Sequence, residues 1–471
     1  MYKKSKVAPM TSRLVDGPRG RRFLYELLAR AEQRENGEYN ENSLVSAMWD
    51  LSIRLTRDDG SHAVATFEWT GEEAGASKRK GNTGRLIGRI RKKWMARSRG
   101  PWHRSGSFRL GLKPGWAAHA PAAGYTSGQS FNPVPHWKEG VPPVRDLVTS
   151  AKVAVLIREA SKRLGEEKIP MSDLVQALAE SVISARYWQE PDMIDIILSD
   201  PVVADALRDS EEMLELLGLD FEMLAGGGVE LAATWLIDEI DSQCVVKPSE
   251  QVLDAWLKST VARTESATRE RPDDSTANWS GHWWSTPPRG LLVSNGETVD
   301  GDPAAFSCTE DGPISTRAEI RELTVPEKRV LVIENAEDWA ELSKRFPLDI
   351  TAEVRHDWFR VTGLDVTWII PNWRDVAREW DGVKLSVRGY LTSATRAIDV
   401  GDNASMIAGW GPGETFWLNG EGIFVGESEI WEQSNVGDLL WERVSNRHGE
   451  NLEDDETALG GNEGPEDQLF N

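Results

Sequence analysis

The sequence predicts an α+β protein, in which an all-helical middle region is followed by a mixed-sheet C-terminal domain with short helices. Between Asp146 and Thr264 the apolar residues recur at helical spacing. From Trp279 onward they form short runs separated by tight turns and single helices, a pattern typical of mixed sheets. The 471 residues are too many for one ordinary core, and a length of this kind indicates about three domains.

Composition divides the chain into five predicted segments. They are a basic, mixed N-terminal region with a long Gly/Pro-rich loop (1–143), a helical domain (144–264), a linker (265–278), a tryptophan-rich α+β domain (279–441) and an acidic tail (442–471). The tail has no Lys or Arg after Arg447. A segment of like charge with few apolar residues favours disorder.

The N-terminal region begins with two predicted helices, over residues 18–34 and 44–55. Phe23, Leu24, Leu27 and Leu28 give the first an apolar face. Residues 62–69 alternate between two faces after an Asp-Gly turn and predict a strand.

A basic segment follows, over residues 78–104. Up to residue 110 the chain has 23 Lys and Arg against 12 Asp and Glu, although its total net charge is -22. A basic helix here is suited to phosphate contacts, with an indole stacking on bases. The nucleic-acid-binding candidates are Arg89, Arg91, Lys92, Lys93, Trp94 and Arg97. The alternative is a solvated face, or one that docks on the acidic part of the same chain.

The middle region is predicted to be helical throughout. In the second of its helices Ser172 is expected to cap the N-terminus, with Asp173 in the first turn. The expected helices cover residues 146–164, 172–188, 192–198, 202–217, 231–240 and 248–264.

The C-terminal domain is predicted from six short apolar runs and two helices. The runs cover 290–294, 329–334, 366–370, 383–387, 405–410 and 414–418, and the helices cover 336–346 and 373–380. The chain has 21 tryptophans, and they are concentrated in this domain. Indole suits aromatic cores and also planar or sugar-like ligands.

Several common chemistries lack their motifs. Residues 81–85 have neither the spacing nor the lysine of a P-loop, although Trp235–Asp241 resembles the second nucleotide-binding box of P-loop ATPases. The spacing of Leu231, Trp235 and Ile240 favours a surface helix instead. The cofactor is therefore left unknown.

Cysteine and histidine content argues against a metal site. The two cysteines, Cys244 and Cys308, cannot form a disulfide framework or a cysteine-based metal site, and the seven histidines do not cluster in the sequence. No segment approaches the roughly 18 consecutive apolar residues of a membrane span. We expect a cytoplasmic protein without a membrane partner, the alternative being export by an unrecognised route.

The stretch Arg355-His-Asp-Trp-Phe-Arg360 is the leading candidate site. Arg355, His356, Asp357 and Arg360 could form a polar cluster in which a carboxylate orients the imidazole for general base work or anion binding. On the predicted strand, however, consecutive residues point to opposite faces, so at most His356 pairs with Trp358, or Arg355 with Asp357. The alternative is an arginine–aspartate pair and an aromatic-covered histidine at a sheet edge. The catalytic candidates are His356, Asp357 and Glu414, and the ligand-binding candidates are Arg355, Trp358, Arg360 and Tyr390.

Six blocks carry a resemblance to uncharacterised proteins of high-GC Gram-positive bacteria. They are Arg186–Asp192, Gly281–Pro287, Arg355–Arg360, Pro371–Ala377, Asp381–Leu391 and Gly409–Leu418. The resemblance implies a bacterial, cytoplasmic setting and no particular chemistry.

These observations predict a binding or interaction protein. Its tryptophan-rich domain is expected to hold a ligand or partner, and its basic segment to contact an unidentified protein or a phosphate-rich ligand. The alternatives are an enzyme acting on nucleotides or nucleic acid, such as an ADP-ribosyltransferase-like enzyme or a nuclease, and a nucleic-acid-binding protein.

Overall fold

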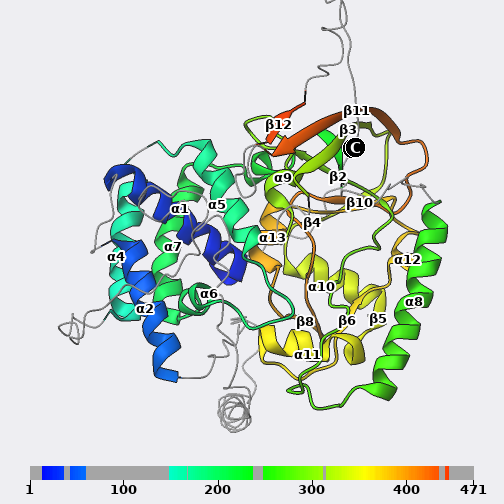
Figure 1. Cartoon of the computed structure of the whole chain (residues 1–471), viewed down its shortest axis with the longest axis horizontal. Coiled ribbons are helices and arrows are strands. Elements are labelled where there is room, and N and C mark those ends of the chain that lie inside the picture. Colours follow the sequence, from blue (N-terminus) through cyan, green and yellow to red (C-terminus); the bar gives the residue numbers. More distant parts are fainter. Residues whose placement is uncertain are drawn as a thin grey trace, which may run out of the picture.

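The computed structural model describes residues 13–36, 43–59, 148–166, 168–236, 248–310, 315–433 and 441–444. The predicted strand 62–69, the basic segment 78–104 with all its nucleic-acid-binding candidates, the loop 105–143 and residues 445–471 of the acidic tail lie outside these ranges. The described residues form a helical part beside a sheet that carries its own helices (Figure 1), which confirms the predicted α+β class.

The helical part is assembled around its first long helix. This helix, α1, packs against η1, α2, α4, α5, α6 and α7, and the predicted apolar face from Phe23 to Leu28 is completely buried. The bounds are η1 Leu14–Asp16, α1 Pro18–Asn36, α2 Leu44–Asp59, α4 Ser150–Leu164, α5 Met171–Ile183, α6 Met193–Leu198 and α7 Pro201–Leu216. The N-terminal helices therefore share one bundle with the middle helices, and the predicted division at residue 143 does not separate them.

Helix α5 differs from its prediction at both ends. It begins at Met171 after Pro170, so Ser172 lies inside the first turn and does not cap it. It ends at Ile183 and not at Trp188, which frees residues 184–192 to cross toward the sheet.

In the part of the chain that the structure describes, the central sheet has eight strands in the order β12-β11-β3-β1-β2-β10-β7-β4. All neighbours are antiparallel except β4 and β7, which are parallel. The bounds are β1 Gly227–Trp235, β2 Leu292–Glu297, β3 Arg317–Thr324, β4 Val330–Ile333, β7 Gly382–Leu385, β10 Thr415–Trp417, β11 Phe424–Gln433 and β12 Trp441–Arg443. Two small sheets pair β5 (Pro347–Asp349) with β6 (Ile369–Pro371) and β8 (Ile398–Val400) with β9 (Asn403–Ser405).

Strand β1 occupies a segment predicted to be helical over 231–240. Residues four apart lie on the same side of both a helix and a strand, so the spacing of Leu231 and Trp235 did not distinguish the two. Leu231, Ala233 and Trp235 follow the two-residue period of a strand and pack together against Phe306. The surface-helix interpretation of this segment was wrong.

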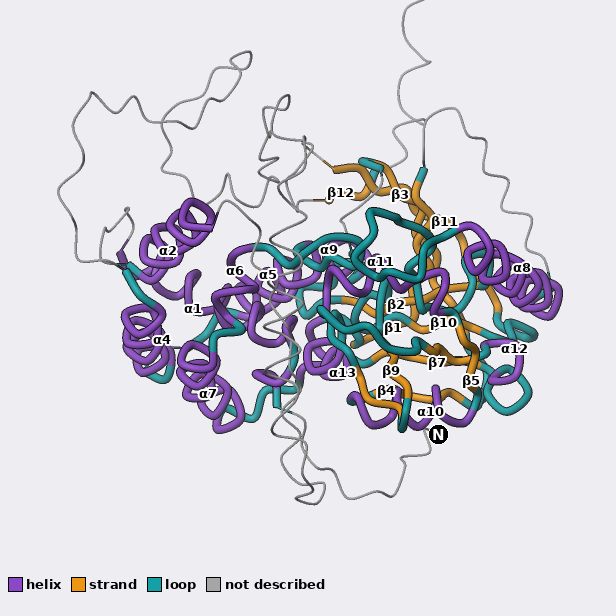
Figure 2. Tube along the Cα trace, turned by 90° about the horizontal axis from the view of Figure 1, so that it is seen from below, coloured by secondary structure: helices purple, strands orange, loops and turns teal. Residues whose placement is uncertain are grey.

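Six helices of the described ranges accompany the sheet. They are α8 Ser249–Glu270, α9 Ala305–Cys308, α10 Ala336–Arg345, α11 Thr351–Thr362, α12 Trp373–Val376 and α13 Val387–Ser393, and a short turn, η4 (Phe221–Leu224), precedes β1. In the view from below, the strands lie between α8 on one side and α13 on the side of the helical part (Figure 2). Helix α8 runs six residues into the predicted linker 265–278. No helix in the described ranges combines the length and the apolar character that crossing a membrane requires.

Helix α11 contains the stretch Arg355–Arg360, which was predicted to be a strand. An Asp349 carboxylate oxygen accepts a hydrogen bond from the Thr351 amide at 2.9 Å before the helix, and Gly363 ends it with a φ of 69°. Val354, Trp358 and Val361 then fall on one face and are buried in a common cluster. The strand prediction failed because the dense run of charged and aromatic residues hid this helical spacing.

One hydrophobic core crosses from the helical part into the sheet. It includes Leu24 of α1 together with Tyr390 and Leu391 of α13. Gly17 lies so close to α13 that an added Cβ would be 2.2 Å from the Leu391 carbonyl oxygen. The two parts are therefore in close contact, and α13 lies at their junction.

Candidate ligand-binding site

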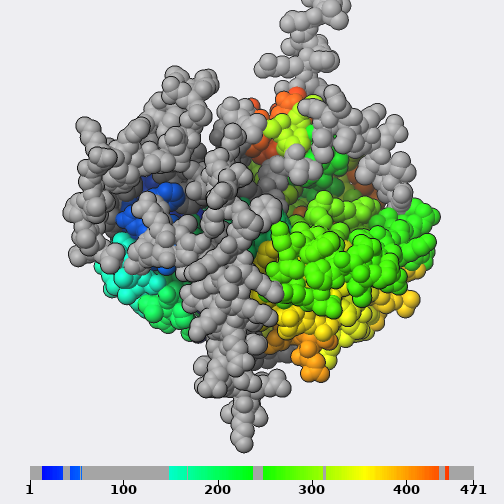
Figure 3. All heavy atoms as spheres, turned by 60° about the horizontal axis from the view of Figure 1, so that its bottom comes forward, coloured from blue at the N-terminus to red at the C-terminus, as the bar shows by residue number. Residues whose placement is uncertain are grey.

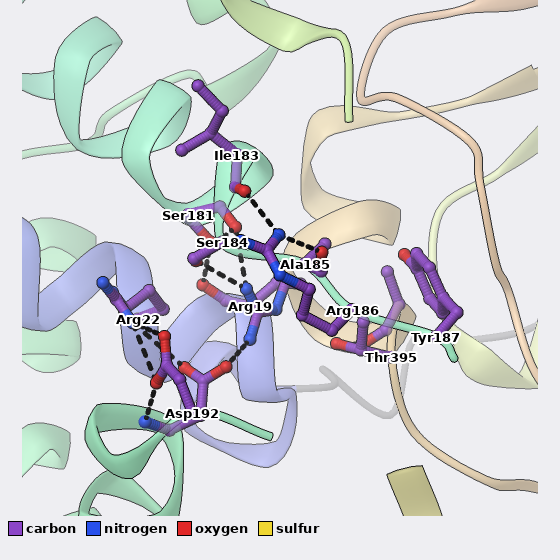
Figure 4. Close-up of polar contacts among 12 residues, drawn as sticks. Arg19, Arg22, Ser181, Ile183, Ser184, Ala185, Arg186, Tyr187, Asp192 and Thr395 are labelled. Carbon is purple, nitrogen blue, oxygen red and sulfur yellow. Dashed lines mark hydrogen bonds and ion pairs between the residues drawn. The ribbon is translucent and has the colours of Figure 1, made fainter. Parts of the chain in front are cut away.

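Buried arginines of α1 hold the loop that joins α5 to α6 (Figure 4). Arg19 forms an ion pair with Asp195 and donates to the Ser181 carbonyl and the Ser184 hydroxyl, both at 2.8 Å. Arg22 lies 3.1 Å from an Asp192 carboxylate oxygen. Residues 184–192 are thus anchored at both ends.

The carboxylates of this network respond differently to burial. Burial alone would raise the pKa of Asp192, but the Arg22 guanidinium holds it below its ordinary value. For Asp195 burial outweighs the attraction of Arg19, and its pKa is raised.

The anchored loop presents Tyr187 and Trp188 to a stack of rings that we call the aromatic ladder: Tyr187, Trp188, His282, Trp283 and Trp284. Trp283 is at its centre, with ring centroids 5.3 Å from Tyr187, 4.9 Å from Trp188 and 4.4 Å from Trp284. His282 contacts Trp284 edge-on at 4.6 Å. Such offset and edge-on contacts stabilise aromatic pairs beyond the area they bury.

The ladder differs in exposure from the tryptophans of the core. Trp188, His282, Trp283 and Trp284 are half-buried and only Tyr187 is buried, whereas Trp339, Trp373 and Trp410 are among the largest completely buried side chains. In the space-filling view, the green segment that includes α8 and residues 279–289 lies at the surface beside the yellow region of α11 (Figure 3).

Side chains of helix α11 hold the backbone of the ladder residues through hydrogen bonds. Asp357 accepts a hydrogen bond from the Gly281 amide at 2.8 Å and one from Arg360 at 2.7 Å. Arg360 also donates to the carbonyl oxygens of Trp188, at 3.1 Å, and Trp279. The Trp358 indole donates to the Trp283 carbonyl at 3.1 Å. The predicted ligand-binding residues Trp358 and Arg360 therefore position ladder residues through their backbones.

The predicted polar cluster, in which a carboxylate orients the His356 imidazole, is not formed by the described residues around His356. Successive helical residues point about 100° apart, and the His356 Nε2 lies 3.2 Å from the Pro272 carbonyl oxygen instead. Burial lowers the pKa of His356, so its imidazole is neutral at pH 7. Arg355 pairs with Asp273 at 2.6 Å. The arginine–aspartate pair of the alternative interpretation is present between Arg360 and Asp357, on a helix and not on a strand.

Glu414 and Tyr390 lie on the sheet side of the junction. The Glu414 carboxylate accepts a hydrogen bond from the Gly411 amide at 3.0 Å, and burial raises its pKa to about 7. Tyr390 is completely buried. Burial and the charge of Glu310 raise the pKa of Tyr390 well above its ordinary value. Glu310 also accepts a hydrogen bond from Tyr187, and so connects the ladder to α13.

Two charged residues beside the ladder had no signal in the sequence. Glu310 follows α9, and Arg289 follows Pro288 at the Trp284 end of the ladder. Neither belongs to a motif, and only the fold brings them to the rings. The aromatic runs themselves were visible in the sequence, but their pairing across about a hundred residues was not.

The described residues hold no group of three or more His, Cys, Asp and Glu side chains arranged to bind a metal ion. Cys308 is buried, and burial raises the pKa of its thiol to about 12, which keeps it protonated at neutral pH. Cys244 lies outside the described residues.

No protein-family model, curated protein or solved structure matches the chain. The geometry of the ladder and of its charged neighbours is therefore the basis on which a function is assigned.

The position of His282 in the ladder predicts how the stability of the fold depends on pH. Burial, with Arg263 and Arg289 nearby, lowers the pKa of His282 from 6.5 to about 4. Between these two pH values His282 is protonated in the unfolded chain but not in the folded chain. The folded state therefore loses stability as the pH falls from about 6.5 to about 4. We expect His282→Gln to remove about 2 kcal/mol of this loss, allowing for partial exposure.

Urea unfolding of both proteins at pH 7, 5.5 and 4.5 measures this contribution. As the pH falls, the free energy of unfolding of the wild type is expected to decrease more than that of His282→Gln. A difference that stays constant over this range would show that His282 titrates alike in both states.

Proposed function

We propose that this chain is a binding protein that holds a planar ligand on the aromatic ladder. Its resemblance to proteins of high-GC Gram-positive bacteria supports placing it in the cytoplasm of such a bacterium. The ladder lies where the helical part meets the sheet, and junctions of this kind are common places for ligand sites.

The observation that carries the proposal is the convergence of four separate stretches on one set of half-buried rings. Residues 184–192, 279–289, 355–360 and 409–414 supply the rings, the backbone anchors and the charged neighbours. Beside them Trp279 is 43% exposed, and its carbonyl shares the Arg360 guanidinium with that of Trp188. Clustered, exposed aromatic surface typically marks a binding site.

The ladder is also held rigidly before any ligand binds. Trp188 and Trp283 are fixed through their carbonyl oxygens, and the loop that carries Trp188 is anchored by Arg19 and Arg22. Rigid aromatic side chains lose little conformational entropy on binding, which favours affinity. Glu310 and Glu414 add polar groups that can orient a ligand.

A titration of planar heterocycles tests the proposal. Adenosine, AMP, nicotinamide and nicotinate are each titrated by calorimetry, up to about 1 mM, where a weak complex is still detected. We expect at least one to bind, and Trp188→Leu and Trp284→Leu to weaken that binding about tenfold or more, as for aromatic residues at the centre of binding sites.

The matched control is Trp49→Leu. Trp49 is 40% exposed on α2, in the helical part, and its replacement is expected to leave the affinity unchanged. Binding by none of the four compounds, or equal binding by the ladder variants, would contradict the proposal.

The enzyme and nucleic-acid alternatives stay predictions. The basic segment lies outside the described residues. Asp357 and His356 are occupied by separate backbone partners. No contact described at the ladder favours either alternative over ligand binding.

A further inference from the structure

We propose that the ligand carries an anionic group, a carboxylate or a phosphate, and that Arg289 binds this group at the Trp284 end of the ladder. This inference rests on the proposed function and specifies the chemical class of its ligand.

Arg289 differs from the other arginines around the ladder in having its donors free. Arg263, Arg271, Arg355 and Arg360 each donate to a carboxylate or a carbonyl oxygen. Arg289 is exposed, and with the described residues it forms no hydrogen bond and no ion pair within 4 Å. Its guanidinium carbon lies 5.1 Å from the centroid of Trp284. The five N–H donors of a guanidinium match carboxylate and phosphate groups.

The backbone that carries Arg289 is fixed. The Ser285 amide donates to the Ala408 carbonyl at 3.1 Å, and the Ala408 amide donates to the Ser285 hydroxyl at 2.8 Å. The Trp373 indole donates to the Ser285 carbonyl at 3.2 Å. A Cβ added to Gly409 would be 2.2 Å from the Trp284 ring, so this ring has no room to move toward the loop. Trp284 therefore offers Arg289 a rigid surface on which to stack.

The charges near Arg289 leave its positive charge uncompensated. The Glu414 carboxylate is close enough to interact with Arg289, but its hydrogen bond goes to the Gly411 amide. Burial raises its pKa to about 7 against the opposing effect of Arg289, which reduces the negative charge that it presents to Arg289 at pH 7. Arg289 in turn helps to keep His282 neutral. The Arg289 guanidinium forms no ion pair within the described residues, so it can bind the anionic group of a ligand.

These features favour a ligand that joins a planar ring to an anion. The ring lies against the ladder, and the anion reaches the guanidinium. A nucleoside monophosphate and an aromatic carboxylate share this chemistry, whereas a neutral heterocycle uses the ladder alone.

The test compares matched neutral and anionic probes by calorimetry at pH 7. AMP is compared with adenosine to examine phosphate, nicotinate with nicotinamide to examine carboxylate, and inorganic phosphate is titrated alone. We expect the anionic member of at least one pair to bind about tenfold more tightly or better, as charge-assisted hydrogen bonds predict. The pair that shows the preference identifies the anion.

Arg289→Met keeps an apolar side chain against Trp284 and removes the charge. It is expected to abolish the anionic preference while leaving the affinity of the neutral member within about twofold. Arg378→Met is the control, because Arg378 is 70% exposed and its one ion pair within the described residues is with Asp375. Near-ultraviolet circular dichroism verifies that the ladder is intact in each variant.

The outcomes separate the two proposals. Equal binding of neutral and anionic members, or a preference that survives Arg289→Met, overturns the anion site and leaves the ladder as a binding site. If no planar probe binds, the proposed function fails and this inference fails with it. Binding of inorganic phosphate alone, unaffected by Arg289→Met, also counts against Arg289.

Discussion

Replacing Arg19 with alanine is expected to lower the free energy of unfolding by about 3–5 kcal/mol, the usual cost of breaking a buried ion pair. The side chains of Arg19 and Asp195 are 1% and 4% exposed. Without the guanidinium, the Asp195 carboxylate, the Ser181 carbonyl and the Ser184 hydroxyl all lose a donor. Urea unfolding followed by circular dichroism measures the loss.

A surface pair gives the control for this prediction. Arg208 and Asp205 are 4.0 Å apart and 50% and 63% exposed, so Arg208→Ala is expected to change stability by no more than about 1 kcal/mol. The double variant Arg19→Met/Asp195→Leu removes both charges and is expected to be clearly more stable than Arg19→Ala. If Arg19→Ala and Arg208→Ala cost the same, the buried network does not hold the loop.

Replacing Asp357 with alanine is expected to have an effect of similar size, about 3–5 kcal/mol, and to disorder the ladder. Asp357 is completely buried, and it accepts from Gly281, next to the ladder, and from Arg360, which holds Trp188 and Trp279. The near-ultraviolet circular dichroism of the stacked tryptophans reports the ladder, and urea unfolding reports stability.

The control for Asp357 is Glu432→Ala. Glu432 pairs with Arg317 at 2.8 Å, but both side chains are 47% exposed, and its loss is expected to cost at most about 1 kcal/mol. An unchanged near-ultraviolet spectrum in Asp357→Ala would mean that α11 does not position the ladder.

The elements that could be predicted from the sequence are those whose apolar pattern is unambiguous. The buried face of α1 and the strand β4 lie where the pattern indicated. Helix α1 also buries Arg19 and Arg22. Their partners Asp192 and Asp195 are more than 160 residues away in the chain, and no local pattern encodes such a pair.

Two elements were assigned to the wrong class of secondary structure, for different reasons. The segment of β1 was predicted as a helix because residues four apart share a face in both structures. The segment of α11 was predicted as a strand because its dense run of charged and aromatic residues hid the helical spacing of Val354, Trp358 and Val361. For α11 the decisive signals were the Asp349–Thr351 cap and Gly363. The dense run of charges between them was interpreted as a possible catalytic cluster, whereas its polar groups hold neighbouring backbone.

The candidate site was visible in the sequence only in pieces. The segments that carry the ladder rings, Arg186–Asp192 and Gly281–Pro287, were noted only as separate blocks of a resemblance, and Glu414 was named among the candidates. Convergence of these blocks depends on the junction between the helical part and the sheet, which a single sequence does not reveal. Arg289 and Glu310 could not be recognised at all, because their importance comes from the rings beside which they lie.

The most direct test of the ladder as a ligand site is a crystal structure of the protein with AMP. The purine is expected to lie against the half-buried rings of the ladder, in contact with Trp284, with its phosphate within hydrogen-bond distance of Arg289. A purine bound elsewhere, with the ladder free of ligand, would contradict the assignment of the ladder as the binding site.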